Sequence, residues 1–420
     1  MPKVVKHALL SLCLLGIPLG VSSCFHRTVD PDVGLQPPVR SAEFAASLAK
    51  TARAPWLPGN DLRTLPNGDA FFPPMIEAIR RARKTITFET FAFVEAPVTR
   101  EVTQALAERA REGVAVHMIL DKTGSRKAGK PNVKKLRDAG VELHFFHPVN
   151  PLTPKRSNNR THRKILVVDG KIAFTGGAGF AHAWSGNAHS PKHWRDTQYE
   201  IKGPAVAPIQ KSFTENWLEL TGVQLKGPSY FPSLDRAGPY SVQVVSDGPH
   251  DKSHPIAHSY LAAVNGARHS LMMEQSYFIP TTPFRKALLR AAKRGVDIQV
   301  LVPNKLIDSK PARRASQNHW RVLLENGIRI FEYEPTMMHA KLLVADERLS
   351  IIGSSNFDER SFFINDEINL HVDSPSFARE QLRMMEKDLV NAREITLENL
   401  SDVLEPGYKR FPMRFLETQF

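Results

Sequence analysis

One pattern of residues occurs twice in this 420-residue chain and constrains its fold more than any other feature. The first copy consists of His162, Lys164, Asp169 and Gly176. The second copy, at identical spacing, consists of His339, Lys341, Asp346 and Gly353. The histidine and the lysine of each copy are two residues apart, so on an extended strand both side chains leave the same face. The repetition predicts a duplicated fold.

The segments around the two copies repeat as well. Residues 105–121 and 287–303 each indicate an amphipathic helix, a glycine at which the helix stops, and an apolar strand. Residues 133–146 and 320–333 follow the same order. Helices that alternate with strands are typical of α/β folds. We therefore predict an α/β protein of two duplicated lobes rather than a short-repeat solenoid.

Composition along the chain suggests where these lobes begin and end. Residues 25–69 and 226–241 are rich in proline, glycine and polar residues, as tethers and linkers are. After residue 376 the sequence becomes helical and charged. The predicted divisions are a targeting segment (1–24), a tether (25–69), a first lobe (70–225), a linker (226–241), a second lobe (242–376) and a helical tail (377–420) that packs on the second lobe.

The targeting segment resembles the signal of a bacterial lipoprotein. Lys3 and Lys6 precede an apolar run from Ala8 to Val21, which is short for a membrane span, and the run ends in a lipobox-like Val-Ser-Ser-Cys. Cleavage before Cys24 would leave a lipidated cysteine that holds the protein on a membrane surface. We expect a lipoprotein of the cell envelope that faces outside the cytoplasm. The choice between inner and outer membrane, and an uncleaved anchor, remain open.

Charge and cysteine content narrow the choice of partners. The formal net charge of +13 favours anionic partners, whether phospholipid headgroups, membrane surfaces or nucleic acid. Cys13 lies in the signal and Cys24 is the proposed lipidation site, which leaves no cysteine for a disulfide or a zinc cluster. The sequence also has no HExxH motif and no acidic cluster. We therefore expect neither a metal nor a cofactor.

Two histidines and two lysines suit the cleavage of a phosphodiester. That reaction needs a nucleophile, a proton for the leaving alkoxide, and positive charge around the phosphate oxygens. Because histidine titrates near neutral pH, one ring can attack while the other carries the proton. The lysines can supply the charge that a metal ion supplies elsewhere.

The repeated HxKxxxxD pattern resembles that of the phospholipase D superfamily, over nearly all of residues 60–410. The resemblance implies two lobes, each a mixed β-sheet flanked by helices, with one active site at their interface and a phosphohistidine intermediate. His162 would be the nucleophile and His339 the general acid, although the order could be reversed. The implied phosphate-binding residues are Lys164, Lys341, Ser354, Asn356, Gly176 and Gly177. Glu367 would orient His339, and Asp196 would orient His162.

Two features of the motif leave questions open. Asp169 and Asp346 are candidates for catalysis, but capping of the turn after each strand is the favoured role. In addition, the second copy ends in Gly-Ser-Ser-Asn, whereas the first ends in Gly-Gly-Ala-Gly, so Gly179 stands where the family usually has asparagine. Backbone N–H groups of the glycine-rich turn could compensate for the missing amide.

Within the superfamily the chain looks most like the bacterial cardiolipin synthases. The resemblance rests on residues 158–177, 193–206, 277–280 and 353–370. It implies a phosphatidyltransferase that makes cardiolipin from phosphatidylglycerol and a second phospholipid. A hydrolytic phospholipase D that makes phosphatidic acid is the alternative. A nuclease is less expected, and a catalytically silent lipid-binding lipoprotein is the non-enzymatic reading. The acceptor lipid, an accessory protein and the oligomeric state remain open.

Overall fold

A computed structural model describes residues 34–150, 152–249 and 251–405. The predicted targeting segment lies outside these described residues. The first half of the chain contains α1 (Ala42–Thr51), β1 (Leu57–Pro66), α2 (Gly68–Arg81), β2 (Thr85–Thr90), α3 (Pro97–Arg111), β3 (Ala115–Asp121), α4 (Lys130–Asp138), β4 (Glu142–Phe146), α5 (Pro154–Asn158), β5 (Ile165–Val168), β6 (Ile172–Gly176), a 3₁₀ turn (His182–Trp184), β7 (Thr197–Lys202) and α6 (Val206–Thr221).

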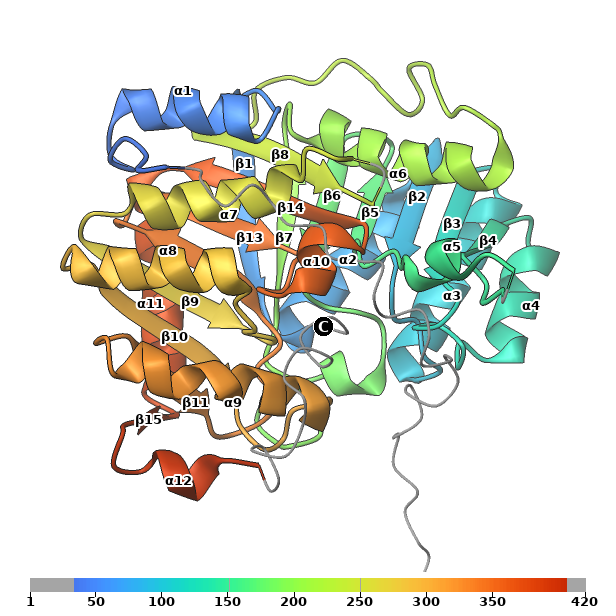
Figure 1. The fold of residues 1–420 in the computed structure, drawn as a ribbon. Coiled ribbons are helices and arrows are strands. Elements are labelled where there is room, and N and C mark those ends of the chain that lie inside the picture. Colours follow the sequence, from blue (N-terminus) through green and yellow to red (C-terminus); the bar gives the residue numbers. More distant parts are fainter. Residues whose placement is uncertain (1–33, 151, 250, 406–420) are drawn as a thin grey trace, which may run out of the picture.

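The second half repeats this succession of elements (Figure 1). It contains β8 (Tyr240–Asp247), α7 (Pro255–Gly266), β9 (Ser270–Gln275), α8 (Thr282–Lys293), β10 (Asp297–Pro303), α9 (Lys310–Leu324), β11 (Arg329–Tyr333), β12 (Lys341–Ala345), β13 (Leu349–Gly353), α10 (Glu359–Phe363), β14 (Glu367–Asp373), α11 (Pro375–Leu389), β15 (Ala392–Ile395) and α12 (Leu400–Val403).

The strand order confirms the predicted duplication. The first lobe has the order β1-β7-β6-β5-β2-β3-β4, and the second has the corresponding order β8-β14-β13-β12-β9-β10-β11, with β15 added at its edge. In both lobes three strands run parallel, and the motif strands β5 and β12 are antiparallel to β2 and β9. The fold is therefore α/β with a mixed sheet in each lobe, as expected.

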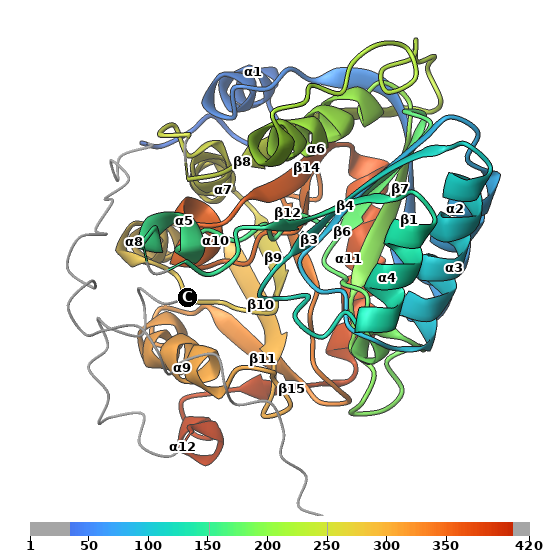
Figure 2. The same ribbon diagram turned by 90° about the vertical axis from the view of Figure 1, so that its right-hand side faces the viewer.

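The two lobes share one hydrophobic core. The first residues of β1 pair with the first residues of β8, which joins the two half-sheets. A single buried cluster then contains side chains from β5, β6, β7 and α6 of the first lobe and from β8, β12, β13, β14 and α11 of the second. Helices α2–α4 cover the outer face of the first lobe and helices α7–α9 that of the second (Figure 2). This arrangement brings the two motifs to the interface.

The predicted tether is wrong for the residues that the structure describes. Helix α1 packs on α7, with Phe44 and Leu48 buried, and β1 pairs with both β7 and β8. Strand β1 is thus the counterpart of β8, and the first lobe begins near Leu57 instead of residue 70. Pro58 and Gly59 lie at an irregularity in its pairing with β8, which explains why the segment resembles a linker.

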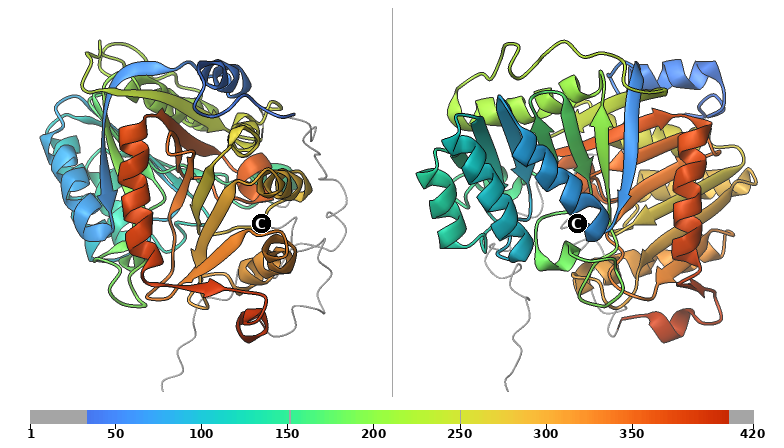
Figure 3. Two further views of the ribbon diagram at one scale, coloured as in Figure 1. Left: turned by 90° about the vertical axis from the view of Figure 1, so that its left-hand side faces the viewer. Right: turned by 180° about the vertical axis from the view of Figure 1, so that it is seen from behind.

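The C-terminal segment is part of the fold and not only a helical tail. Helix α11 lies at the rear of the molecule beside β1, where Gln381 donates a hydrogen bond of 2.9 Å to the hydroxyl of Thr64 (Figure 3). Strand β15, which the sequence did not predict, pairs with β11.

In the described part of the chain, no helix has both the length and the apolar character that a membrane crossing requires.

Candidate active site

The two histidine–lysine pairs lie where the lobes meet, at the carboxyl ends of β2 and β9. The backbone N–H of His162 donates to the carbonyl of Asp366 (2.9 Å), and that of His339 donates to the carbonyl of Arg195 (2.7 Å). Asp366 belongs to the second lobe and Arg195 to the first. Each histidine is therefore fixed by the backbone of the opposite lobe, which places both motifs in one site.

Each histidine also receives its carboxylate from the opposite lobe. His162 Nδ1 lies 2.8 Å from Glu367 Oε1, and His339 Nδ1 lies 2.7 Å from Asp196 Oδ2. The predicted pairing, with Glu367 behind His339 and Asp196 behind His162, is therefore wrong. Each carboxylate meets the histidine of the other lobe because its neighbour in the sequence, Asp366 or Arg195, already binds the backbone of that histidine.

Glu367 is held by two serine hydroxyls besides His162. Ser361 Oγ donates to Glu367 Oε1 at 2.7 Å, and Ser354 Oγ donates to Oε2. Ser354 is completely buried. The resemblance implied that Ser354 binds the phosphate. In the structure its hydroxyl instead orients the carboxylate of Glu367.

Asp196 is held by different donors. Trp184 Nε1 and the backbone N–H of Thr197 each donate to its carboxylate at 2.8 Å. A Cβ at Gly177 would lie 2.2 Å from Asp196 Oδ1, and one at Gly176 would lie 2.4 Å from the carbonyl of Thr197. The N–H of Gly177 donates to that same carbonyl. Gly177 therefore makes room for Asp196, and Gly176 makes room for the backbone of Thr197. The structure does not support the phosphate-binding role predicted for Gly177.

The second lobe carries a chain of hydrogen bonds from its lysine to its asparagine. Lys341 Nζ donates to Ser276 Oγ (2.7 Å), and this hydroxyl donates to Asn356 Oδ1 (2.7 Å). Since the carboxamide oxygen of Asn356 is engaged, its amide nitrogen is the end suited to a phosphate oxygen. The geometry is compatible with the predicted phosphate-binding role of Asn356 and Lys341.

The first lobe has apolar residues at the equivalent positions. Phe91 follows β2 as Ser276 follows β9, and its ring lies 5.9 Å from Lys164 Nζ. A Cβ at Gly179 would lie 2.9 Å from the Cβ of Ala92 and 3.1 Å from the ring of Trp184. The position that asparagine usually occupies is thus already filled in this lobe.

The site shifts the pKa of every ionisable group within it. Burial lowers the pKa of His162 to about 4 and that of His339 to about 3, and the charged lysine beside each ring adds to the effect. Burial likewise lowers the pKa of Lys164 to about 7 and that of Lys341 to about 8. Burial alone would raise the pKa of Glu367, but the charge and the hydrogen bond of His162 outweigh it and lower the pKa to about 2.

These pKa values define the protonation of the site near neutral pH. Both imidazoles are neutral, and a carboxylate at Nδ1 requires the ring proton to be on that nitrogen. The lone pair is then on Nε2 in both rings, which is the form that attacks phosphorus. Among the described residues, no group of three or more His, Cys, Asp or Glu side chains is arranged to hold a metal ion.

His339 lies between two tryptophans that the sequence did not single out as site residues. The ring of Trp194 stacks on the imidazole with centroids 5.2 Å apart, and that of Trp184 meets it edge-on at 5.2 Å. His162 meets Phe91 edge-on at 5.4 Å. Trp194 is in a segment that carries the family resemblance, but no sequence signal marked Trp184.

The motif aspartates cap turns at the far ends of the motif strands. The carboxylate of Asp169 accepts backbone N–H groups from residues 83–85, and that of Asp346 accepts those from residues 268–270. Each aspartate follows its strand, whereas the histidines precede the strands. The structure places both in the turn-capping role that was favoured, at the opposite ends of the strands from His162 and His339.

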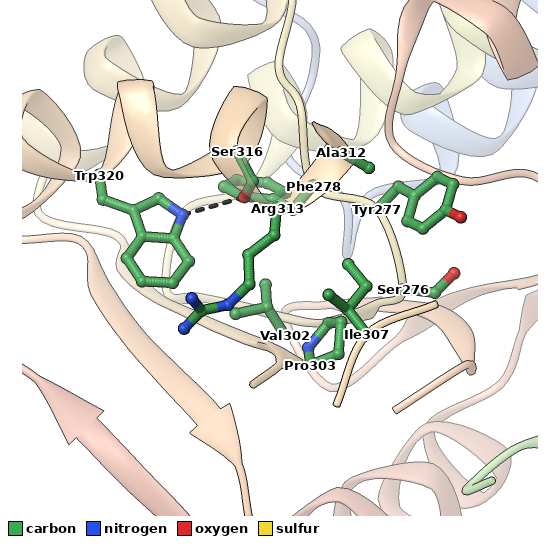
Figure 4. A pocket seen from close by; sticks show the side chains of 10 residues that line it. All are labelled: Ser276, Tyr277, Phe278, Val302, Pro303, Ile307, Ala312, Arg313, Ser316 and Trp320. Carbon is green, nitrogen blue, oxygen red and sulfur yellow. Dashed lines mark hydrogen bonds between the residues drawn. The ribbon is translucent and has the colours of Figure 1, made fainter. Parts of the chain in front are cut away.

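A small cavity lies beside the hydrogen-bonded residues Lys341, Ser276 and Asn356 of the second lobe. It lies between β10 and α9 and leaves room for about one water molecule (Figure 4). Ser276 and Tyr277 form its edge nearest the site, and Trp320 Nε1 donates to Ser316 Oγ at 3.0 Å within its wall. This cavity is a packing gap and too small for a phosphatidyl group.

Comparison with known proteins agrees with this geometry. A family model described as "Cardiolipin synthase, PLD-like domain" matches residues 75–217 and 260–389, one segment in each lobe. The chain belongs to this PLD-like family. It is 33% identical to cardiolipin synthase 2 of Bacillus anthracis over 80% of the chain and 66% of that relative, and so spans about two thirds of the relative's length. It is 34% identical to cardiolipin synthase A of Pseudomonas fluorescens over 86% of the chain and 75% of that relative.

Solved structures show the same fold. Phosphatidylserine synthase of Haemophilus influenzae superposes with a TM-score of 0.64 at 13% identity, over 89% of this chain and 96% of that one. Polyphosphate kinase of Porphyromonas gingivalis gives a TM-score of 0.54 at 15% identity, over 81% of this chain and 49% of that one. Both solved chains therefore share the overall fold of this chain.

Proposed function

We propose that the protein is a phosphatidyltransferase that makes cardiolipin from phosphatidylglycerol and a second phospholipid. The carrying observation is the pair of neutral histidines, each with a buried carboxylate from the opposite lobe at Nδ1 and a buried lysine two residues away. Relatives at 33–34% identity that are named cardiolipin synthases support this choice of reaction.

His162 is the nucleophile in this proposal. Its Nε2 attacks the phosphorus of phosphatidylglycerol, the P–N bond forms, and the P–O bond to glycerol breaks. His339, which is neutral in the free site, takes up a proton on Nε2 from solvent when the anionic phosphate binds, and gives that proton to the departing oxygen. It then accepts the proton of the incoming lipid hydroxyl, whose oxygen attacks phosphorus as the P–N bond to His162 breaks. The ring of Trp194, which stacks on His339, stabilises the protonated imidazole once it has formed, since a cation is attracted to an aromatic face.

The lysines balance the charge of the phosphate. Lys164 and Lys341 are 4% and 3% exposed, so each loses most of its hydration in the free site. A bound phosphate anion stabilises their charged forms and reverses the lowering of their pKa by burial. Lys341 and Asn356 bind the phosphate oxygens from the second lobe, whereas Lys164 acts alone in the first, where apolar residues replace the polar chain.

The activity is tested with purified protein and labelled phosphatidylglycerol. Cardiolipin and glycerol as products support the proposal, phosphatidic acid indicates a hydrolytic phospholipase D, and cleavage of single-stranded DNA in a parallel reaction indicates a nuclease. His162→Ala should remove covalent labelling of the protein by the substrate. His339→Ala should slow both labelling and turnover, because glycerol then leaves without a proton from His339. Full turnover by either variant contradicts the mechanism.

We further propose that the mature protein is a membrane-anchored lipoprotein of the cell envelope. Support comes from the lipobox-like sequence before Cys24. An acyl anchor would keep the enzyme at the surface where both substrates reside, which raises their effective concentration. Incorporation of labelled palmitate that disappears in Cys24→Ala is the expected result, and equal labelling of the two proteins would disprove it.

A further inference from the structure

Two loops of the first lobe extend from the edge of the sheet that carries the site. Residues 122–129 follow β3, and residues 147–150, 152 and 153, with α5, follow β4. The guanidinium of Arg160 ties them together, because it donates to the hydroxyl of Thr123 (2.9 Å) and to the carbonyl of His147 (2.6 Å). Arg360 of the second lobe donates to the carbonyl of Asn158 at 2.6 Å. The loops are thus fixed at the site, a few residues before His162.

The loop after β4 exposes two large apolar side chains. Leu152 is 90% exposed and Val149 is 73% exposed. The loop is nevertheless ordered by its own hydrogen bonds: the side chain of Asn150 accepts the N–H of Leu152 (2.9 Å), and its carbonyl accepts the N–H of Thr153 (3.0 Å). An ordered turn thus holds two large apolar side chains in water, and burial against an apolar partner would remove that surface from water.

The chain segments that carry these apolar side chains and the neighbouring loop are basic, although Glu219 of α6 pairs with Arg156 at 3.4 Å. Residues 122–137 and 143–168 contain no aspartate or glutamate. Residues 122–130 after β3 contain four basic side chains, and all four are exposed: Lys122, Arg126, Lys127 and Lys130. Positive charge next to protruding apolar side chains complements a bilayer with anionic headgroups. Nucleic acid would be attracted by the positive charge, but its phosphate backbone has no apolar surface against which Leu152 and Val149 could be buried.

We propose that residues 122–130, 147–150, 152, 153 and 156–158 form a docking surface for an anionic phospholipid bilayer. Leu152 and Val149 enter the headgroup region, and the four basic side chains after β3 bind lipid phosphates. The site then faces the bilayer, and substrates reach His162 without crossing water. The proposal rests on the proposed function for its choice of a lipid partner, but the binding that it describes is measurable without catalysis.

The opposite edge of the sheets offers matched controls. Leu35 is 70% exposed and lies near the start of β9, where Arg268 donates to the carbonyl of Gln36. Arg83 and Lys84 are exposed and directly precede β2. These side chains resemble those of the docking surface in kind and exposure but lie at the amino ends of the strands. Their replacement tests whether location or composition alone decides binding.

The experiment compares full-length proteins that all carry Cys24→Ser, so that no acyl chain contributes. Co-sedimentation is measured with vesicles of phosphatidylglycerol and phosphatidylethanolamine, and with vesicles of phosphatidylcholine alone. Val149→Ser with Leu152→Ser should weaken binding to the anionic vesicles at least tenfold. Lys122→Gln and Lys127→Gln should each weaken it about fivefold and reduce its dependence on salt. Leu35→Ser, and Arg83→Gln with Lys84→Gln, should bind like the parent.

The same variants separate docking from catalysis. With short-chain phosphatidylglycerol below its micelle concentration, the docking variants should turn over substrate at the parent rate, whereas on vesicles they should be slowed in proportion to their binding. Unchanged vesicle binding by the Val149/Leu152 variant, or equal losses in the controls, would overturn the docking surface. Loss of DNA binding in the lysine variants without any effect of the apolar changes would overturn it in favour of nucleic acid. Binding as predicted without cardiolipin formation would refute only the proposed function.

Discussion

At the scale of single residues, the two halves of the site support a carboxylate in different ways. In the second lobe, Ser354 fills the position after the strand and its hydroxyl holds Glu367. In the first lobe, Gly177 leaves that position empty, and the shorter Asp196 is held by the indole of Trp184. Trp184 therefore supplies the donor that the glycine-rich turn lacks, and its ring occupies space that a side chain at Gly179 would need.

Replacement of Trp184 by phenylalanine tests this role. The phenylalanine ring keeps an aromatic contact with His339 but cannot donate to Asp196. Because a hydrogen bond to a charged group contributes about 1.5–3 kcal/mol, we expect kcat to fall roughly 10- to 100-fold with little change in KM. The matched control is Trp194→Phe, which preserves the stack on His339. Steady-state kinetics of both variants decide the matter, and equal losses in kcat would assign both tryptophans to packing alone.

At the scale of helices and strands, the sequence predicted what is encoded locally. The helices α3 and α8 and the strands β3 and β10 follow from hydrophobic periodicity and from the glycines that end the helices. Strand β1 was missed because its proline, its glycine and its charged residues resemble a linker, and only its pairing with β7 and β8 makes it a strand. Strand β15 was also missed, because only its pairing with β11 makes it a strand.

The site shows the same division between local and distant information. The repeated spacing predicted both histidines and both lysines, because each motif lies within one hairpin. The carboxylate partners were assigned to the wrong histidines, because spacing along the chain carries no information about which lobe faces which ring. Trp184 has no motif, and it reaches Asp196 only through the 3₁₀ turn that ends at it.

Helix α11 provides a prediction at this scale. Asp388 lies near its end and accepts a 2.8 Å hydrogen bond from Arg195 Nε, and both side chains are at least nine-tenths buried. The carbonyl of Arg195 in turn holds the backbone of His339. Removal of one partner from a buried ion pair usually costs about 3–5 kcal/mol. Asp388→Ala should therefore lower the free energy of unfolding by about that amount and reduce activity.

The control for that variant lies on the same helix. Glu386 is exposed, so Glu386→Ala should change the free energy of unfolding by less than about 0.5 kcal/mol. Denaturation by urea measures both variants. If Asp388→Ala and Glu386→Ala had the same free energy of unfolding, the contact of α11 with Arg195 would not stabilise the fold.

At the scale of the whole molecule, the site exists only when the lobes are docked on each other. Each lobe contributes a histidine that lacks a carboxylate of its own and a carboxylate that serves the other lobe. The shared core and the two backbone hydrogen bonds to the histidines maintain this exchange. The two lobes therefore differ at Ser276 and Phe91, yet each histidine has one carboxylate and one backbone carbonyl from the opposite lobe.

Double-mutant cycles measure this exchange directly. At pH 7.5, where both imidazoles are neutral, His162→Ala and Glu367→Gln should be coupled in the free energy of unfolding by about 1.5 kcal/mol or more, because each removes the same hydrogen bond to a charged group. His162→Ala and Asp196→Asn, which belong to the same lobe but to different pairs, should be additive within about 0.5 kcal/mol. Strong coupling of His162 with Asp196 and none with Glu367 would restore the pairing within lobes and contradict the architecture described above.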